Sequence, residues 1–263
     1  MGGGHGSSNV AAMLLLLRIV VGLAALVAVR VALAKSFGGV ITAAALLGTY
    51  AVFVRLTERR WPAELKRPWE LGLGLLVGAG LCAVTILILY LLGHYHIDGT
   101  NPVSAIWPAV GVVITAGVFE ELLLRGVLFR LLEEKLGSWL AVALSAAAFG
   151  ALHLANPEAT LFTSAAIALQ AGVLLALAFM ATRRLWLPIG MHVAWNFSES
   201  VIFGVPLSGF AYAGLLRSHL TGPPLISGGA FGVEGSALTV AICLTAAAAL
   251  YRYARKNLKP FGR

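Results

Sequence analysis

The 263-residue chain is 59% hydrophobic and only 11% charged, and its mean hydropathy is +0.90. A soluble domain carries about 25% charged residues, so this composition excludes an ordinary soluble protein. The net charge of +8 does not indicate nucleic-acid binding, because the Lys and Arg residues lie in short clusters between apolar runs. We predict an all-α, polytopic integral membrane protein forming a single membrane domain over 1–263.

About eight apolar runs are long enough to be transmembrane helices, since a bilayer core of about 30 Å needs about 20 helical residues. The first run is predicted to be a retained helix and not a cleaved signal peptide, because no Lys or Arg precedes it. Residues 1–10 are predicted to be a flexible N-terminal tail. The predicted spans are 13–34, 37–55, 70–93, 103–131, 138–155, 159–181, 185–204 and 236–252.

The connections between these runs differ in charge. Basic residues gather at 55–70, 130–138 and 182–184 and again in the C-terminal segment, whereas 93–102 and 155–159 have none. Cytoplasmic loops of membrane proteins carry the excess of Lys and Arg. The pattern therefore predicts a multi-pass protein of the plasma (inner) membrane with both termini in the cytoplasm.

Several polar and charged residues are expected to lie at the membrane interface or in solvent, without a functional role. Arg18 and Arg30 lie inside the first run, and we expect each to extend its side chain to the nearer membrane interface. The segment 205–235 is rich in Gly and Pro and is expected to be an external loop with room for a short re-entrant piece. His219 and Glu234, within this loop, are expected to be solvated.

Other residues within the spans are assigned structural roles. Cys82 and Cys243 are predicted to be buried as small apolar side chains, because no metal-binding or disulfide spacing surrounds them. Gln170 and Glu199 are predicted to form hydrogen bonds between helices, which is the usual role of an isolated polar residue in a membrane bundle.

The stretch "FEELLLRGVLF", 119–129, places three charges in an apolar run. A charge at the centre of a membrane helix costs about 2.5–3.5 kcal/mol of insertion free energy, so three such residues indicate a structural or functional role. Glu121 and Arg125 are four residues apart and can pair on one helix face, as a structural or a catalytic ion pair. Glu120 is turned about 100° away and has no such partner. It is therefore the candidate general base.

Further polar residues lie at similar depth on two other spans. By helical rise, Glu121, His153, His192 and Asn196 each lie about 12–22 Å from the cytoplasmic end of their own span. His192 and Asn196 are also four residues apart and share a face. This convergence predicts one buried polar site, and it favours chemistry over simple contacts between helices.

Three motifs occur in order, each on its own predicted span: "EELLLR" at 120–125, "FGALH" at 149–153 and "HVAWN" at 192–196. They match the EExxxR, FxxxH and HxxxN motifs of the CPBP family. This family comprises CAAX proteases and bacteriocin-processing enzymes and is related to the Ras-converting CAAX endopeptidase. The chain resembles this family over about 103–204, and no motif position departs from the pattern.

The resemblance implies an intramembrane endopeptidase that acts on a membrane-associated substrate, either lipidated or bearing a leader. It implies that Glu120 activates the attacking water and that His153 shares this work. It also implies that His192 and Asn196 stabilise the oxyanion of the tetrahedral intermediate. The expected partners are the lipid bilayer and a peptide or protein substrate.

The resemblance assigns supporting roles to Glu121, Arg125 and Phe149. It leaves a zinc cofactor open, because members of this family are commonly labelled metalloproteases although a glutamate mechanism without metal fits these residues equally well. If zinc is bound, the implied ligands are Glu120, His153 and His192.

Two other functions compete with proteolysis. A non-catalytic scaffold or immunity protein of the same fold would be expected to have degraded motifs, and these are intact. A proton-coupled transporter also uses carboxylates and histidines within the membrane, but it predicts inverted repeats, and the sequence shows none.

Overall fold

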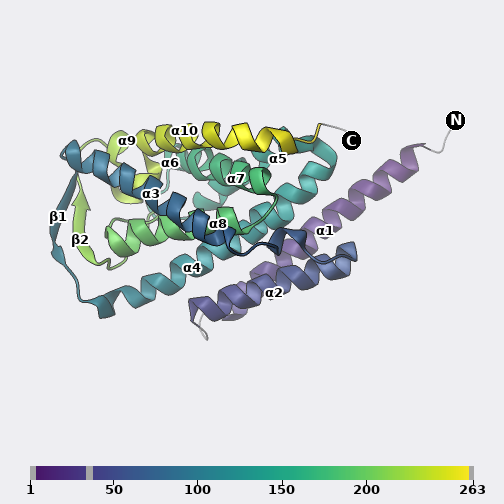
Figure 1. Ribbon diagram of the computed structural model, residues 1–263, viewed down its shortest axis with the longest axis horizontal. Helices are drawn as coiled ribbons and strands as arrows, with labels where there is room; N and C mark the ends of the chain where they lie inside the picture. Colours follow the sequence, from purple (N-terminus) through teal and green to yellow (C-terminus); the bar gives the residue numbers. More distant parts are fainter. Residues whose placement is uncertain (1–3, 34–37, 261–263) are drawn as a thin grey trace.

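The computed structural model describes residues 4–33 and 38–260, and in this part of the chain long helices lie side by side (Figure 1). One small antiparallel sheet, of β1 (Tyr95–Thr100) and β2 (Leu216–Leu220), closes one end. The helices are α1 (Gly4–Leu33), α2 (Gly39–Glu58), α3 (Glu70–Leu91), α4 (Trp107–Glu121), α5 (Arg130–His153), α6 (Leu161–Ile167), α7 (Leu174–Thr182), α8 (Trp186–Asn196), α9 (Pro224–Ser227) and α10 (Ala237–Ala254).

Within the described residues, five helices are long and apolar enough to cross a membrane. They agree with the prediction of an all-α membrane protein and correspond to five of the eight predicted spans. The three other predicted spans, 103–131, 138–155 and 185–204, fall on helices that carry the polar motif residues. The five helices are Val10–Leu33, Gly39–Glu58, Glu70–Leu91, Leu161–Thr182 and Ala237–Asn257.

Two predicted boundaries differ from the structure. Helix α1 begins at Gly4, so residues 4–10 of the expected tail are helical, while 1–3 lie outside the described residues. The segment 130–138, expected to be a loop, is helical and turns at Gly137. Gly137 has φ 71°, a left-handed conformation that glycine adopts without steric cost. The chain is therefore kinked at Gly137, and the helical pieces before and after this residue together form α5.

Close packing fixes the position of α8, which carries the third motif. A methyl group on Gly78 of α3 would lie 2.1 Å from the carbonyl oxygen of Met191. One on Gly190 of α8 would lie 2.5 Å from the carbonyl oxygen of Leu71. Small residues let membrane helices approach closely enough for dispersion contacts to hold them together. His192, next to Met191, is thus placed by backbone contact between α3 and α8.

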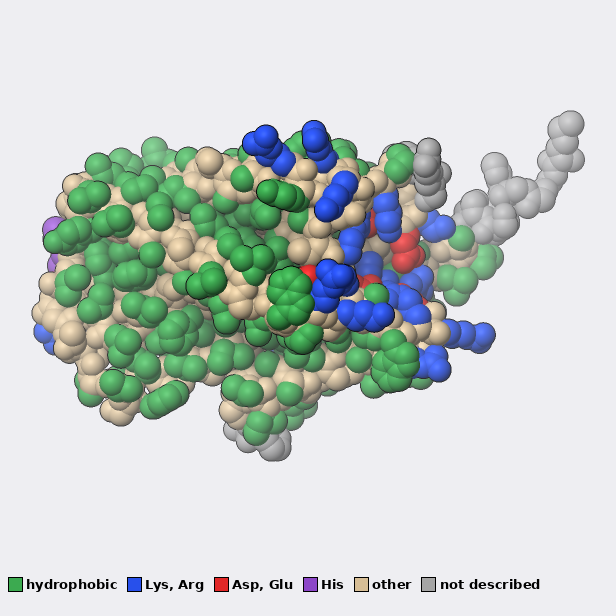
Figure 2. Space-filling view, in the orientation of Figure 1, with side chains coloured by type: hydrophobic (Ala, Val, Ile, Leu, Met, Phe, Trp, Pro, Cys, Tyr) green, Lys and Arg blue, Asp and Glu red, His purple; other side chains and the backbone are tan. Residues whose placement is uncertain are grey.

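Charged side chains gather at the end of the molecule where α1 begins and α10 ends (Figure 2). We call this the charged end and define it by Glu58 and the arginines around it. Glu58 accepts from Arg130 at 2.5 Å and from Arg60 at 2.8 Å, and it lies 3.2 Å from Arg18. Arg18 therefore reaches a carboxylate cluster at the charged end, and its place at a membrane interface stays a prediction.

The opposite end holds the small sheet, whose two strands lie in segments that the sequence predicts to be loops. Strands β1 and β2 pair antiparallel, with His96 opposite His219 and their rings 5.0 Å apart. His219 Nδ1 lies 2.7 Å from Asp98 and the side chain is exposed, as expected. Strands of six and five residues are too short to give a clear alternating pattern beside long apolar helices.

Candidate active site

The predicted site residues of three helices line one cavity of about 470 Å³. Helix α4 contributes Glu120, α5 contributes His153 and α8 contributes His192 and Asn196. The remaining wall comes from α1 and from the 205–235 loop. The similar depth expected from helical rise therefore corresponds to one shared space in the folded protein.

Glu121 is the centre of a buried three-residue cluster. Its Oε1 accepts a hydrogen bond from Arg125 Nη1 at 2.8 Å and from His192 Nδ1 at 2.9 Å. Arg125 also donates from Nη2 to the carbonyl oxygens of Ala171 at 3.2 Å and Gly172 at 2.9 Å. The predicted pair of Glu121 and Arg125 is present, and His192 is a third member that spacing along one helix could not show.

The two neighbouring glutamates have different surroundings. The side chain of Glu121 is 0% exposed, whereas that of Glu120 is 20% exposed and faces the cavity. Glu120 Oε2 lies 3.8 Å from His192 Nε2, too far for a direct hydrogen bond. Glu120 is thus the accessible carboxylate, and Glu121 is held within the protein.

Hydrogen bonds orient both histidines in the same way. His153 Nδ1 lies 2.7 Å from the carbonyl oxygen of Phe149, which can only accept, so Nδ1 carries the proton. His192 Nδ1 is held likewise by the carboxylate of Glu121. In each ring Nε2 is left for other contacts. A fixed Nδ1–H is the arrangement that prepares an imidazole for acid–base work at Nε2.

Phe149 packs against three of these side chains. Its ring stacks on that of His153 with centroids 4.7 Å apart and lies 5.8 Å from the ring of His192. The guanidinium carbon of Arg125 is 5.1 Å from the centroid of the same ring. Phe149 therefore fixes the relative positions of the first, second and third motifs.

Asn196 lies one turn beyond His192 and is 4% exposed. Its Oδ1 has no hydrogen-bond partner among the described residues, although a buried amide normally has one. Its backbone carbonyl accepts from Ser200 Oγ at 2.7 Å. The side-chain amide is therefore available for a molecule in the cavity.

Three π-helical segments occur close to the site, at 122–129, 168–173 and 197–202. The first contains Arg125, the second contains Gln170, and the third begins directly after Asn196. Such segments are rare and concentrate at functional sites, because the wider turn redirects side chains. Their positions agree with a functional reading of the cavity.

Gln170 and Glu199 were both predicted to form hydrogen bonds between helices, and the structure gives them different kinds of partner. Gln170 Oε1 lies 3.4 Å from Cys243 Sγ on α10, which confirms a contact between helices. Glu199 accepts instead from Trp195 of its own helix at 2.6 Å and from the backbone N–H of Val233 at 3.1 Å. It connects α8 to the 205–235 loop, so the predicted contact between helices is wrong for Glu199.

The 205–235 loop forms part of the cavity wall, and Glu234 within it is buried. The expectation of a solvated Glu234 is wrong: this residue is 4% exposed and lines the cavity. It accepts a hydrogen bond from Ser208 Oγ. No sequence signal identified Glu234, because the loop reaches the site only after it folds back over the helices.

The candidate zinc ligands do not form a coordination sphere. Among residues 4–33 and 38–260, no group of three His, Cys, Asp or Glu side chains is arranged to hold a metal. Zinc requires ligand atoms about 2.0–2.3 Å from the ion on converging directions. The residues present do not fit a zinc site, and the reaction proposed below uses no metal.

Comparison with known proteins agrees with this arrangement. A family model described as type II CAAX prenyl endopeptidase, Rce1-like, matches residues 102–198. No curated protein and no solved structure matches the chain. The match covers less than half of the chain but includes every motif residue from Glu120 to Asn196. The segment that builds most of the cavity is therefore similar to the Rce1-like type II CAAX prenyl endopeptidases, which confirms the resemblance read from the three motifs.

Proposed function

We propose that this protein is a membrane endopeptidase that hydrolyses a peptide bond of a membrane-associated substrate. The observation that carries the proposal is the shared cavity, in which an accessible Glu120 lies beside two histidines whose Nδ1 atoms are held. The family match supports proteolysis in general. The substrate and the roles of single residues belong to the proposal.

In the proposed reaction Glu120 takes a proton from water, and Nε2 of His153 shares in orienting that water. The water oxygen attacks the carbonyl carbon of the scissile bond and forms a tetrahedral oxyanion. Glu120 then delivers its proton to the departing amine as the carbon–nitrogen bond breaks. A positioned base of this kind contributes about 10²–10⁴-fold to the rate.

The oxyanion requires hydrogen-bond donors on the same wall of the cavity. Asn196 supplies an amide N–H, and His192 in its protonated form donates from Nε2. Glu121 balances the charge of that imidazolium through its bond to Nδ1. One donor to an oxyanion is worth about 2.7–4 kcal/mol when it is held in place before the reaction.

We further propose that all eight predicted spans cross the plasma membrane and that both termini are cytoplasmic. Helices α1 and α10 have their terminal ends at the charged end, as the excess of basic residues on the cytoplasmic side requires (Figures 1 and 2). Single cysteines at Lys259 and Arg217 should then react from opposite sides. Cys82 and Cys243 are buried and give a low background. Labelling of both positions from one side would contradict the topology.

The substrate is proposed to be a peptide held at the membrane by a lipid group or by an apolar leader. Prenylated CAAX sequences are one candidate, because the matched family is named for them. No nucleic acid is expected as a partner. The bilayer itself places such a substrate at the depth of the cavity.

The decisive experiment uses purified full-length protein in lipid nanodiscs and a membrane-tethered fluorogenic peptide. The wild-type protein should cleave the peptide, and Glu120→Gln should bind it but cleave it about 10²–10⁴-fold more slowly. Glutamine keeps the size of the side chain and removes its basicity. Cleavage at the wild-type rate by Glu120→Gln would show that another group activates the water.

A further inference from the structure

A second, much smaller cavity of about 20 Å³ adjoins the candidate active-site cavity. His192, Asn196 and Glu234 line both cavities, so these three residues form the wall between them. Gln170, in the π-helical segment 168–173, lines the small cavity only, and the rest of its wall is apolar. A cavity of about 10–15 Å³ is enough for one water molecule. The small cavity therefore has room for a water but not for a substrate.

Gln170 brings an unpaired hydrogen-bond donor to the small cavity. Its side chain is 2% exposed, and its Oε1 lies 3.4 Å from Cys243 Sγ of α10. Its Nε2 is enclosed and has no hydrogen-bond partner among the described residues. A buried amide nitrogen without a partner is costly, because it has given up its bonds to water. Since the contact with Cys243 occupies the oxygen, the nitrogen is the atom left for the cavity.

Asn196 brings the complementary atom to the same cavity. Its Oδ1 is enclosed without a partner in the described part of the chain, and an amide oxygen can only accept a hydrogen bond. Gln170 Nε2 can only donate, yet neither of these two atoms bonds to the other. The carboxyl group of Glu234 is a further acceptor in the wall. A buried water typically makes about three hydrogen bonds, and one donor with two acceptors supplies them.

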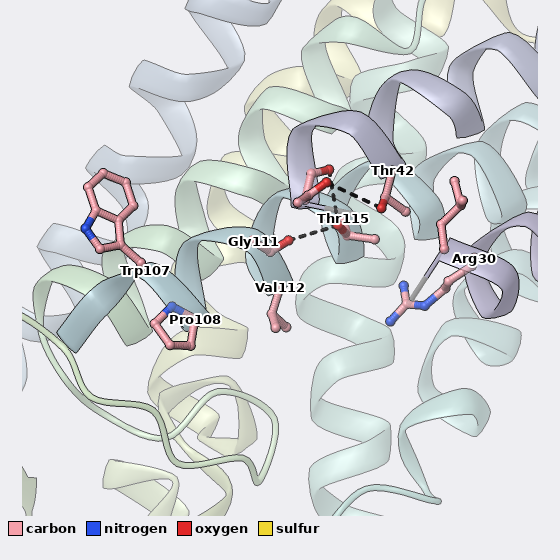
Figure 3. Close-up of a pocket in the computed structure, with 10 residues that line it drawn as sticks. Arg30, Thr42, Trp107, Pro108, Gly111, Val112 and Thr115 are labelled. Carbon is pink, nitrogen blue, oxygen red and sulfur yellow. Dashed lines mark hydrogen bonds between the residues drawn. The ribbon is translucent and has the colours of Figure 1, made fainter. Parts of the chain in front are cut away.

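A larger cavity, of about 400 Å³ beside Arg30, offers a comparison (Figure 3). Its wall includes the hydroxyl groups of Thr42 and Thr115. Thr42 Oγ1 donates to a backbone carbonyl oxygen at 3.4 Å, and Thr115 Oγ1 donates to another at 2.9 Å. Most buried polar groups are satisfied within the protein in this way. The facing amide atoms of Gln170 and Asn196 differ from these hydroxyls, because they need a third molecule between them.

We infer that Gln170 orients the side chain of Asn196 through one water molecule bound in the small cavity. The water accepts a hydrogen bond from Gln170 Nε2 and donates to Asn196 Oδ1 and to the carboxyl group of Glu234. Gln170 does not line the active-site cavity, so it is a positioning residue that acts through Asn196. This inference rests on the proposed peptidase function and specifies what holds its oxyanion donor in place.

The water bridge decides which end of the Asn196 amide faces the substrate. With Oδ1 held in the small cavity, the N–H groups of Nδ2 are directed to the active-site cavity, where the proposed oxyanion forms. The flipped amide would present its oxygen to the oxyanion and repel it. A donor of this kind is effective when it is fixed before the reaction. A water-mediated hydrogen bond is nearly as favourable in enthalpy as a direct one, so it can hold the productive orientation.

The test measures single-turnover cleavage and peptide affinity for Gln170→Met, Asn196→Ala and the double variant, each as full-length protein in lipid nanodiscs. Methionine is close to glutamine in size and lacks the amide donor. Gln170→Met should lower the cleavage rate about three- to tenfold, as the loss of one hydrogen bond implies, with little change in peptide affinity. In the Asn196→Ala background the same substitution should have no further effect, because the amide that Gln170 orients is gone.

Ser164→Ala is the matched control. Ser164 Oγ is also enclosed without a partner among the described residues, but Ser164 lines neither of the two cavities. This variant should keep the wild-type cleavage rate. A loss in Ser164→Ala equal to that in Gln170→Met would overturn the inference. So would additive losses in the double variant, since they would mean that Gln170 acts independently of Asn196.

A high-resolution crystal structure of the wild-type protein answers the question even if Gln170→Met does not fold. It should show one ordered water within about 3 Å of both Gln170 Nε2 and Asn196 Oδ1. A dry cavity, or a direct hydrogen bond between the two amides, would overturn the inference. The ordered water in a protein that cleaves no membrane-tethered peptide would instead refute the peptidase function alone.

Discussion

The charged end and the active-site cavity both place arginine and glutamate side chains inside a helical bundle, but they pair them differently. At the charged end Glu58 accepts hydrogen bonds from Arg130 and Arg60 and also lies close to Arg18. Among the described residues of the cavity, Glu120 has one neighbour within ion-pair distance, His192 at 3.8 Å, and Arg30 has none.

This difference separates charges that hold the fold from charges available for a substrate. A buried charge with several partners has its desolvation offset within the protein. A charge that faces a cavity without a partner raises the energy of the empty protein and is stabilised when a complementary group binds. Glu121 and Arg125 are fully buried behind the cavity wall and are paired with each other as the charges at the charged end are, so they connect the two kinds of environment.

The largest effect is expected from Glu120→Gln. Turnover should fall by about 10²–10⁴-fold because the base is lost. Thermal stability should change little, because the side chain has no close partner in the protein. Peptide cleavage and the unfolding temperature, measured on the same preparation, check both statements. If Glu120→Gln strongly lowered the unfolding temperature, Glu120 would be one of the charges whose pairing stabilises the fold.

Arg125→Ala and Glu58→Gln test the paired charges in each region. Arg125→Ala leaves the buried carboxylate of Glu121 without its arginine, at an expected cost of about 3–5 kcal/mol of folding stability. Glu58→Gln should cost less, because the arginines around Glu58 keep Glu64 or Glu134 as a partner. Both variants should give less folded protein in membranes. Arg125→Ala should also lower the turnover of the protein that does fold, because Glu121 then holds His192 less firmly, whereas Glu58→Gln should not. Equal turnover of the two folded variants would contradict the idea that only the paired charges beside the cavity affect catalysis.

Asn196→Ala tests the proposed oxyanion contact. It should lower turnover by about 10²–10³-fold while the affinity for the peptide stays nearly constant. The folded yield should be close to that of the wild type, because Asn196 Oδ1 has no partner to lose. Single-turnover kinetics separate the two parameters. Weaker binding with an unchanged rate for the bound peptide would make Asn196 a substrate contact.

Metal removal should have the smallest effect. Since the described histidines and carboxylates do not form a ligand set, dialysis against a strong chelator should leave cleavage within about twofold of the untreated protein. Metal analysis of the purified protein provides the control. Loss of activity that zinc restores would show that ligands converge only in another conformation.

The sequence predicted much of this arrangement because its signals are local. Spacing along one helix paired Glu121 with Arg125, and the structure has this pair at 2.8 Å. Apolar length identified the five helices that are long enough to span a bilayer. The catalytic roles of Glu120, His153, His192 and Asn196 stay predictions, although the structure brings these four residues to one cavity.

The errors fell where contacts between distant segments decide the outcome. Glu234 was expected in solvent, but the loop that carries it folds against the helices and Ser208 holds its carboxyl group. For Arg30 the sequence predicts only an extension to the interface, whereas the structure adds that its guanidinium lies over Phe119 of another helix, beside the cavity. In neither case does the local sequence contain the partner.

By itself the sequence determined that the protein is a membrane helix bundle and which helices carry charge, because burying charge in lipid is costly enough to leave a visible pattern. It also determined the neighbours on each helix, since helical geometry is fixed. Only the tertiary structure decided which charges are satisfied, since this depends on contacts between helices. The bond from His192 to Glu121, the lack of an ion-pair partner for Arg30 among the described residues, and the burial of Glu234 all arise in this way.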